Sequence, residues 1–390
     1  MNKLDLDYQN LLNDILENGV EKNTRNGKVL SVFGRSIRYK FKDGKFPLLT
    51  TKKMYWKGIA TELLWFLRGD TNIKFLVDNS CHIWDGDAWA NYSKKVIANN
   101  LQLIPAIDLP KTKEEFINKI KTDDEFAKKW GELGPIYGKQ WRGWTKKKMY
   151  LSTDGSYENI YDDADQTVID QIAILINELK TNADSRRLMV NAWNVGEISE
   201  MTLPPCHYGF QVYTRELSER ERWELYTTIC IKLNTSIKES ANKETMESYY
   251  TKHNIPTRAI SLMWNQRSVD VPLGLPFNLA SYGLLLEIIA KEVNMVPDEL
   301  IANLGDCHIY LNQIEGVKEQ LTREPYPLPT LNINTEWWPT ESGECGVGPI
   351  DAQAVLRSFS DDNFCKCFME DDLQLANYKS HPAIKMPLSN

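Results

Sequence analysis

Residues 266–293 read QRSVDVPLGLPFNLASYGLLLEIIAKEV and join a polar segment directly to an apolar one. Residues 278–293 are apolar on most faces at helical spacing, which predicts a buried helix. Residues 266–278 supply a cation, a hydroxyl, a carboxylate and an amide within a short stretch. We therefore expect a core helix that follows directly on a segment equipped to bind a polar ligand.

A second informative segment, residues 204–207, reads PPCH and places Cys206 beside His207. A catalytic thiol reacts as the thiolate, and nearby cations lower the pKa of such a thiol. A cysteine in an intracellular protein is more often a small buried hydrophobic side chain. Together with residues 266–278, however, Cys206 predicts a nucleophile that faces an anionic, hydrogen-bonding substrate.

Composition places the chain among soluble globular proteins, because 42% of its 390 residues are hydrophobic and 25% are charged. The net charge of −7 argues against a nucleic-acid partner. The seven scattered cysteines are typical of reduced thiols in a cytoplasm. The N-terminus has no signal-peptide pattern, and no apolar run approaches the ~20 residues that span a bilayer. We expect a cytoplasmic protein with no membrane partner.

Hydrophobic periodicity predicts further helices and strands along the chain. The helices are expected at 4–18, 55–68 and 167–180, and the strands at 187–194 and 207–214. Residues 29–39 are expected to form a strand pair or one bent strand. These elements interleave without a regular strand–helix–strand alternation. The pattern favours one α+β domain over residues 1–390 rather than a doubly wound sheet.

Three segments look inserted into this domain, at about 91–131, 215–258 and 335–370. They are charged, polar or turn-rich, but none is low in complexity or resembles a linker. Within the second, Ser236 to Tyr250 has helical character.

The third inserted segment raises the question of a zinc site. Cys345, Cys365, Cys367 and His381 could in principle form a Cys₃His cluster. The spacing of Cys365 and Cys367 is shorter than usual, however, and Cys345 is distant in sequence. We therefore expect free cysteines and no metal.

Eight ordered segments carry a resemblance to a known family. They are FPLLTTK (46–52), ELLWFLRGDTN (62–72), IWD (83–85), GPIYGKQW (134–141), DSRR (184–187), PCH (205–207), QRS (266–268) with Asn278, and GDCHIY (305–310). In these residues the chain resembles the thymidylate synthases and their relatives, the pyrimidine-nucleotide hydroxymethylases. The resemblance implies a mixed sheet packed with helices, with one sheet face at the interface of an obligate homodimer.

The implied reaction transfers a one-carbon unit from 5,10-methylenetetrahydrofolate to C5 of dUMP. Thiolate addition at C6 makes C5 nucleophilic and divides one difficult step into easier ones. The resemblance assigns catalytic roles to Cys206, Glu62, Tyr137, His207 and Asp270. Cys206 matches the nucleophile and Glu62 the carboxylate that organises water. A glutamate inside an apolar helix is costly unless it is partnered or functional.

The resemblance also implies a substrate site for dUMP. The matching residues are Arg25, Arg186, Arg187, Gln266, Arg267, Ser268, Asn278, His308 and Tyr310. Arginines supply directional donors for phosphate, and Arg186 and Arg187 are expected to come from the other subunit. Asn278 offers both a donor and an acceptor to the uracil edge, whereas relatives that act on cytosine nucleotides carry Asp there. His308 and Tyr310 match the groups that hold the sugar hydroxyl.

The folate side is expected to involve Asp270, Lys52, Trp84 and Gly274, where glycine allows close approach of the backbone. Two features depart from the family pattern: Pro272, and a polar end after Leu388 where the family has an apolar tail. Excluding water protects a reactive intermediate, and a polar end could loosen that seal. Reduction of the intermediate by hydride would give dTMP, whereas addition of water would give 5-hydroxymethyl-dUMP. The hydroxymethylase therefore stays open as the alternative, and a non-catalytic nucleic-acid-binding or scaffold relative as a remote one.

Overall fold

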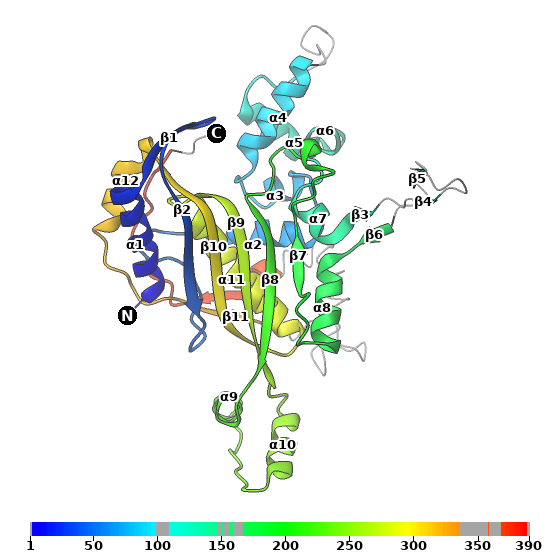
Figure 1. The fold of residues 1–390 in the computed structure, drawn as a ribbon, viewed down its shortest axis with the longest axis vertical. Helices are drawn as coiled ribbons and strands as arrows, with labels where there is room; N and C mark the ends of the chain where they lie inside the picture. Colours follow the sequence, from blue (N-terminus) through cyan, green and yellow to red (C-terminus); the bar gives the residue numbers. More distant parts are fainter. Residues whose placement is uncertain are drawn as a thin grey trace.

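A six-stranded mixed sheet forms the centre of the molecule (Figure 1). In spatial order its strands are β1 (Val20–Thr24), β2 (Gly27–Lys40), β10 (Val296–Tyr310), β9 (Arg258–Asp270), β8 (His207–Glu216) and β7 (Met189–Asn191). Strands β9 and β10 run parallel, and every other neighbouring pair is antiparallel. The expected α+β class with a mixed sheet is confirmed. The computed structural model describes all residues except 1, 99–108, 147–149, 152–156, 159–166, 335–357, 359–367 and 388–390.

The two faces of this sheet differ in burial because successive side chains alternate between them. One row in register is fully buried and consists of Val190, Phe210, Trp264, Ala302 and Ile37. The neighbouring row on the opposite face is half-buried or exposed and consists of Met189, Gln211, Met263, Ile301 and Arg38. The first face therefore carries the core, and the second is open in the isolated chain.

Helices cover the buried face. Helix α11 (Gly274–Glu292) packs on β9, β10 and α2 (Trp56–Leu67), and it is buried on most sides, as its sequence predicted. Helix α7 (Tyr137–Gly143) connects α2 with α8 (Gln171–Thr181), while α1 (Lys3–Asn18) packs on β2 and β10. The expected helices at 4–18 and 55–68 are confirmed.

Two boundaries differ from the expectation. The helix predicted at 167–180 begins only at Gln171, because the Asp170 carboxylate caps it by accepting a hydrogen bond of 2.9 Å from the Ala173 N–H. The residues before it form β6 (Thr167–Ile169), which pairs with β3 (Trp144–Lys146). The strand predicted at 29–39 is longer than expected and pairs with β1, which sequence patterns did not reveal.

Helices α9 (Glu219–Lys232) and α10 (Lys243–Lys252) form a small cluster of their own beyond the end of the sheet (Figure 1). Its buried residues are Tyr226, Cys230, Tyr250 and Ile255. The helix expected from Ser236 is wrong in its start, because α10 begins at Lys243 after an Asn242 cap.

The other elements complete the fold around this sheet. They are α3 (Lys74–Asp78), α4 (Asp85–Ala98), α5 (Lys113–Thr122), α6 (Asp124–Trp130), α12 (Ile314–Leu321), β4 (Tyr150–Leu151), β5 (Tyr157–Glu158), β11 (Thr330–Ile333) and β12 (Leu373–Ala376). No helix in the described part of the chain is long and apolar enough to cross a membrane.

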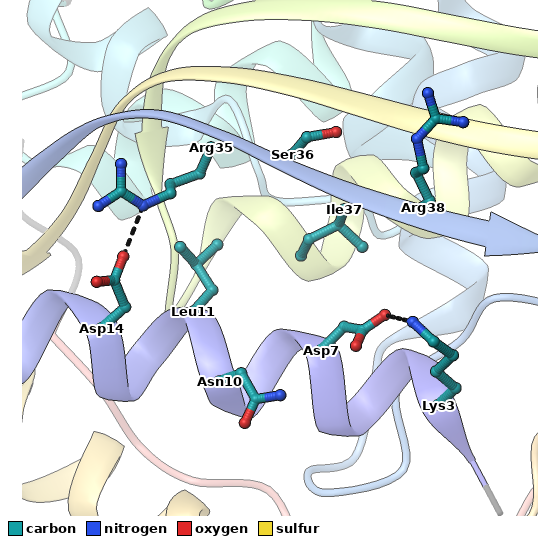
Figure 2. A pocket seen from close by; sticks show the side chains of 9 residues that line it. All are labelled: Lys3, Asp7, Asn10, Leu11, Asp14, Arg35, Ser36, Ile37 and Arg38. Atoms are coloured by element: carbon teal, nitrogen blue, oxygen red, sulfur yellow. Dashed lines mark hydrogen bonds and ion pairs between the residues drawn. The ribbon is translucent and has the colours of Figure 1, made fainter.

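A shallow groove of about 480 Å³ lies between α1 and β2 (Figure 2). Ion pairs join Arg35 to Asp14 and Lys3 to Asp7 along it. No residue expected in a catalytic or binding role lines this groove.

Of the residues considered for zinc, Cys345, Cys365 and Cys367 lie outside the described residues. His381 is engaged elsewhere: its Nε2 lies 2.8 Å from the Glu324 carbonyl oxygen, and its ring stacks on Tyr326. The described residues contain no group of three or more histidine, cysteine or acidic side chains that could hold a metal ion.

Candidate active site

Strand register brings residues 204–207 next to the start of the segment 266–278. His207 at the start of β8 pairs with Gln266 on β9, so the PPCH segment lies beside QRS. His308 on β10 pairs with Asp270 at the end of β9. Three segments that are distant in sequence therefore meet at one end of the sheet.

Cys206 is held at this end by its own backbone. Its N–H donates to the Tyr137 hydroxyl at 2.8 Å, and its carbonyl accepts the Arg267 N–H at 2.8 Å. The Arg267 guanidinium also donates to the carbonyls of Pro204 and Pro205, at 2.9 Å each. The thiol position is thus fixed by a phenol on one side and an arginine on the other.

Burial raises the pKa of the half-buried Cys206 thiol. The positive charge of Arg267 opposes this shift, and the negative charge of Asp87 adds to it. The sequence led us to expect that nearby cations would lower this pKa. Among the described residues, the effect of burial on the thiol pKa outweighs that of Arg267.

His207 is a neutral member of the site. Burial lowers its pKa to about 3, and its Nδ1 lies 2.9 Å from the Tyr282 hydroxyl. Its ring stacks on Tyr137 with centroids 4.3 Å apart. His207 therefore supplies a fixed polar surface rather than a positive charge for a thiolate. Sequence reasoning did not find Tyr282, which lies inside the apolar helix α11.

A short relay fixes the orientation of Asn278. The Trp264 Nε1–H donates to Gln266 Oε1 at 3.1 Å, and an indole N–H can only donate. Gln266 Nε2 is thereby directed to the Ser268 carbonyl and to Asn278 Oδ1, both at 3.1 Å. The Oδ1 side of the Asn278 amide faces Gln266, and its donating Nδ2 side is directed elsewhere. Alternation along β9 places Trp264 and Gln266 on one face, a signal that sequence reasoning could have used.

Glu62 on α2 is a buried carboxylate with one strong partner. Its Oε1 accepts the Trp84 Nε1–H at 2.8 Å. Burial raises the pKa of Glu62 to about 7, and the Trp84 hydrogen bond acts in the opposite direction. The Trp84 ring lies 6.1 Å from that of Tyr137, which holds the Cys206 N–H. Through the Trp84 and Tyr137 side chains, the Glu62 carboxylate is thus linked to the backbone N–H of Cys206.

Asp270 and Lys52 gather around the loop after β9. Asp270 accepts the Leu273 N–H at 2.9 Å and the Gln313 side-chain amide at 3.1 Å. The Lys52 ammonium donates to the Pro272 carbonyl, and burial lowers the pKa of Lys52 to about 8. Pro272, the departure from the family pattern, is thus anchored by its carbonyl.

The space next to this loop is open at Gly274. A Cβ built there would meet only Asp270, at 3.9 Å. Sequence reasoning did not find Gln313, because no pattern marks a buried amide on a short turn.

His308 and Tyr310 line the same end of the sheet. The His308 Nδ1 lies 3.2 Å from Asp306 Oδ1, and its ring meets that of Tyr310 edge-on at 5.3 Å. Burial raises the pKa of Tyr310, and the charges of Asp270, Arg25 and Cys206 also act on it.

Arg25 reaches this region from the turn between β1 and β2. The same positive charge also acts on Asp87, whose carboxyl pKa is raised by burial and lowered by Arg25. The Arg25 Nε–H itself donates to Asn26 Oδ1 at 2.9 Å.

Arg186 and Arg187 are not part of this cluster in the single chain. Both side chains are exposed on the connection between α8 and β7, at the edge of the sheet. Within the described residues neither guanidinium forms an ion pair. These two predicted site residues therefore lie apart from the residues that the contacts above bring together.

Comparison with known proteins relates almost the whole chain to one enzyme family. A sequence model of the family described as thymidylate synthase matches residues 6–390. A protein named thymidylate synthase from Mesoplasma florum is 39% identical over 330 residues, which cover 84% of this chain and 89% of that protein. Proteins of the same name from Malacoplasma penetrans and Mycoplasma mobile are each 37% identical and cover 97% of this chain. They are matched over 98% and 97% of their own lengths, respectively.

Proposed function

Because the chain belongs to the thymidylate synthase family, we propose that Cys206 is its nucleophile and that the cluster around Cys206 is its active site. The protein is a methylenetetrahydrofolate-dependent enzyme that transfers a one-carbon unit to dUMP and forms dTMP. The hydroxymethylase alternative finds no support, since the three relatives described above carry the name thymidylate synthase.

The observation that carries this proposal is the fixed position of Cys206 between Tyr137 and Arg267. Addition of the Cys206 sulfur to C6 of uracil forms an S–C6 bond and moves the C5–C6 electron pair towards C5 and O4. A hydrogen-bond donor placed at O4 stabilises the charge that develops there. The bound folate supplies the one-carbon unit and the hydride.

Asn278 is the residue that reads the base. Its Oδ1 faces Gln266 and its Nδ2 is directed elsewhere, which supports a donor towards uracil O4. The amino group of cytosine is a donor at the same position, so two donors would meet. A site that pairs a substrate group by hydrogen bonding rejects the mismatched analogue strongly. The relay from Trp264 therefore favours dUMP over dCMP.

The phosphate of dUMP is held by arginines from two subunits. Arg267, Ser268 and Arg25 come from the same chain as Cys206, and Arg186 and Arg187 come from a partner. The open sheet face supports a homodimer, because apolar residues gather on it: Met189 is 56% exposed and Tyr213 is 68% exposed. A symmetric dimer buries the same face of both subunits.

Glu62 organises the proton transfers near the ring, with Tyr137 and His207 as its polar surroundings. Its pKa of about 7 supports this role, because an acid–base group works best when its pKa lies near the working pH. His308 and Tyr310 hold the sugar hydroxyl.

Asp270 binds the pterin ring of the folate, and Lys52, Trp84 and Gly274 line the folate side. Open space at Gly274 beside Asp270 supports this arrangement. We place the enzyme in the cytoplasm, which the four free cysteines of the described residues support.

The test traps the covalent intermediate. dUMP with fluorine at C5 cannot lose a proton from that carbon, so with 5,10-methylenetetrahydrofolate the adduct should persist on the enzyme. Peptide mapping should find it on Cys206, and Cys206→Ser should form none while Cys230→Ala, in the remote α9–α10 cluster, forms it normally. An adduct on another cysteine refutes the nucleophile. Failure to release tritium from C5-labelled dUMP would favour a non-catalytic relative.

A further inference from the structure

Helices α9 and α10 form a hairpin that projects from the ends of β8 and β9. Its base is closed by a hydrogen bond of 2.9 Å from the Leu217 N–H to the Thr257 carbonyl. The Arg215 guanidinium joins the hairpin to the sheet, because it pairs with Glu221 of α9 at 2.8 Å and with Asp298 of β10 at 2.9 Å. The hairpin therefore leaves the sheet in a fixed direction.

The tip of this hairpin is apolar and exposed. The two helices are held together by their own buried cluster and by Arg222 of α9, which donates to both carboxylate oxygens of Glu247 on α10, at 2.7 and 2.9 Å. Outside this interior lie the exposed side chains of Ile231, which is 71% exposed, Leu233 and Ile237. We call these three residues the hairpin tip. Large aliphatic side chains that gather on an exposed surface mark a contact with another surface.

Another exposed aliphatic side chain lies beyond the opposite end of the sheet. Helix α4 ends there, and its Ile97 is 65% exposed while the neighbouring Val96 is buried. Figure 1 shows α4, α5 and α6 beyond one end of the sheet and the α9–α10 hairpin beyond the other. The hairpin tip and Ile97 therefore cannot meet within one chain.

The proposed shared site sets the relative direction of two subunits. The antiparallel register pairs Met189 with Gln211. It therefore puts Arg187 at the level of Tyr213, which lies about 23 Å along β8 from Cys206 at about 3.3 Å per residue. If both copies of β8 ran in the same direction across a symmetric contact, Arg187 would stay at that distance from the partner's Cys206. Arg187 reaches the partner's phosphate site only when the two copies run in opposite directions.

Opposite strand directions exchange the ends of the two subunits. Strand β8 begins at the α4 end of the molecule and ends at the hairpin, so the hairpin of one subunit extends past the end at which its partner carries α4 (Figure 1). We propose that the hairpin tip packs on the end of α4 of a second copy of this chain, around Ile97. Two segments that the sequence marks as insertions then meet across the dimer. The inference rests on the proposed shared site, and a symmetric dimer forms the contact twice.

A photochemical cross-link locates the contact in the whole protein. Ile231→benzoylphenylalanine places a photoreactive group in the hairpin tip, and dimers are assembled from isotope-labelled and unlabelled chains. Irradiation should join a labelled chain to an unlabelled one, with the cross-link on α4 or α5 of the partner. Ile174→benzoylphenylalanine is the matched control and should give no such cross-link. Ile174 is also exposed, but it lies on α8, which packs on α7 in the layer over the buried face of the sheet.

Charge substitutions measure how much the contact contributes to assembly. Ile231→Asp combined with Leu233→Asp should raise the dissociation constant of the dimer at least about tenfold in sedimentation, as expected when a large aliphatic side chain is no longer buried. Ile97→Asp should have a similar effect, and adding it to the tip substitutions should change the constant by less than about twofold, because both disrupt the same contact. Ile174→Asp should leave the constant unchanged. At protein concentrations that keep the dimer intact, kcat of the tip variant should stay within about twofold of wild type.

The outcomes separate the inference from the proposed function. Cross-links that stay within one chain or fall on other elements of the partner overturn the contact, and so does an unchanged dissociation constant in the tip variant. If inactive Cys206→Ser and Arg187→Ala chains restore activity together in these cases, the shared site stands without the hairpin contact. A monomeric wild type overturns both.

Discussion

Replacing Trp84 by phenylalanine should raise the pKa of Glu62 further above neutral. Trp84 donates the 2.8 Å hydrogen bond that favours the ionised form of the buried carboxylate, and phenylalanine keeps a ring without the donor. A hydrogen bond to a charged group contributes about 1.5–3 kcal/mol, and one pKa unit corresponds to about 1.4 kcal/mol. The pKa should therefore rise from about 7 by about one to two units.

The assay is the pH dependence of kcat/KM for dUMP in the wild type, Trp84→Phe and Glu62→Gln. The wild type should show a limb near pH 7, which moves upward in Trp84→Phe and is absent in Glu62→Gln. The glutamine variant is needed for assignment, because burial also raises the pKa values of Glu287 and Glu292, to about 7 and about 8. A limb that stays in place in a folded Trp84→Phe protein, or one that survives in Glu62→Gln, refutes the reasoning.

Three other outcomes follow from the same structure. Trp264→Phe removes the donor that orients Gln266 but keeps a ring, so the preference for dUMP over dCMP should fall about fivefold in competition assays. Glu292 is 3% exposed, and neither carboxylate oxygen has a hydrogen-bond partner among the described residues; burial raises its pKa from 4.5 to about 8. The folded state therefore keeps a proton that the unfolded state loses, so unfolding free energy falls as pH rises through this window. In Glu292→Gln, the difference in unfolding free energy between pH 5 and pH 8.5, measured by urea unfolding, should be smaller than in the wild type by up to about 5 kcal/mol. Mixing inactive Cys206→Ser with inactive Arg187→Ala should restore about one quarter of wild-type activity, since half of the randomised dimers would hold one complete site; no recovery after verified subunit exchange contradicts a shared site.

Local sequence patterns were sufficient where burial alone determines structure. Helix α2 carries its apolar stripe in consecutive turns, and α11 is apolar on most sides, so both were predicted. The boundary at Gln171 was not predicted, because it depends on one capping hydrogen bond from Asp170. The start of α10 at Lys243 depends in the same way on Asn242.

The candidate site shows a similar division. The motif residues were predicted because they match the family's motifs segment by segment. Tyr282 and Gln313 were missed because each acts through a partner far along the chain, His207 and Asp270, respectively. Trp264 was missed although its partner Gln266 lies two residues away on the same face of β9.

The charges around Cys206 imply that one chain alone is incompletely equipped for its chemistry. Burial raises the thiol pKa, His207 is neutral, and Arg267 is the one cation that opposes burial at the thiol within the described residues. The phosphate of dUMP would add negative charge near Arg267 and weaken its effect on the sulfur. Arg186 and Arg187 of a partner subunit, under the proposed dimer, would restore the balance by pairing with that phosphate. The exposed Arg186 and Arg187 at the sheet edge and the half-buried Cys206 thiol would then complete one site between two subunits.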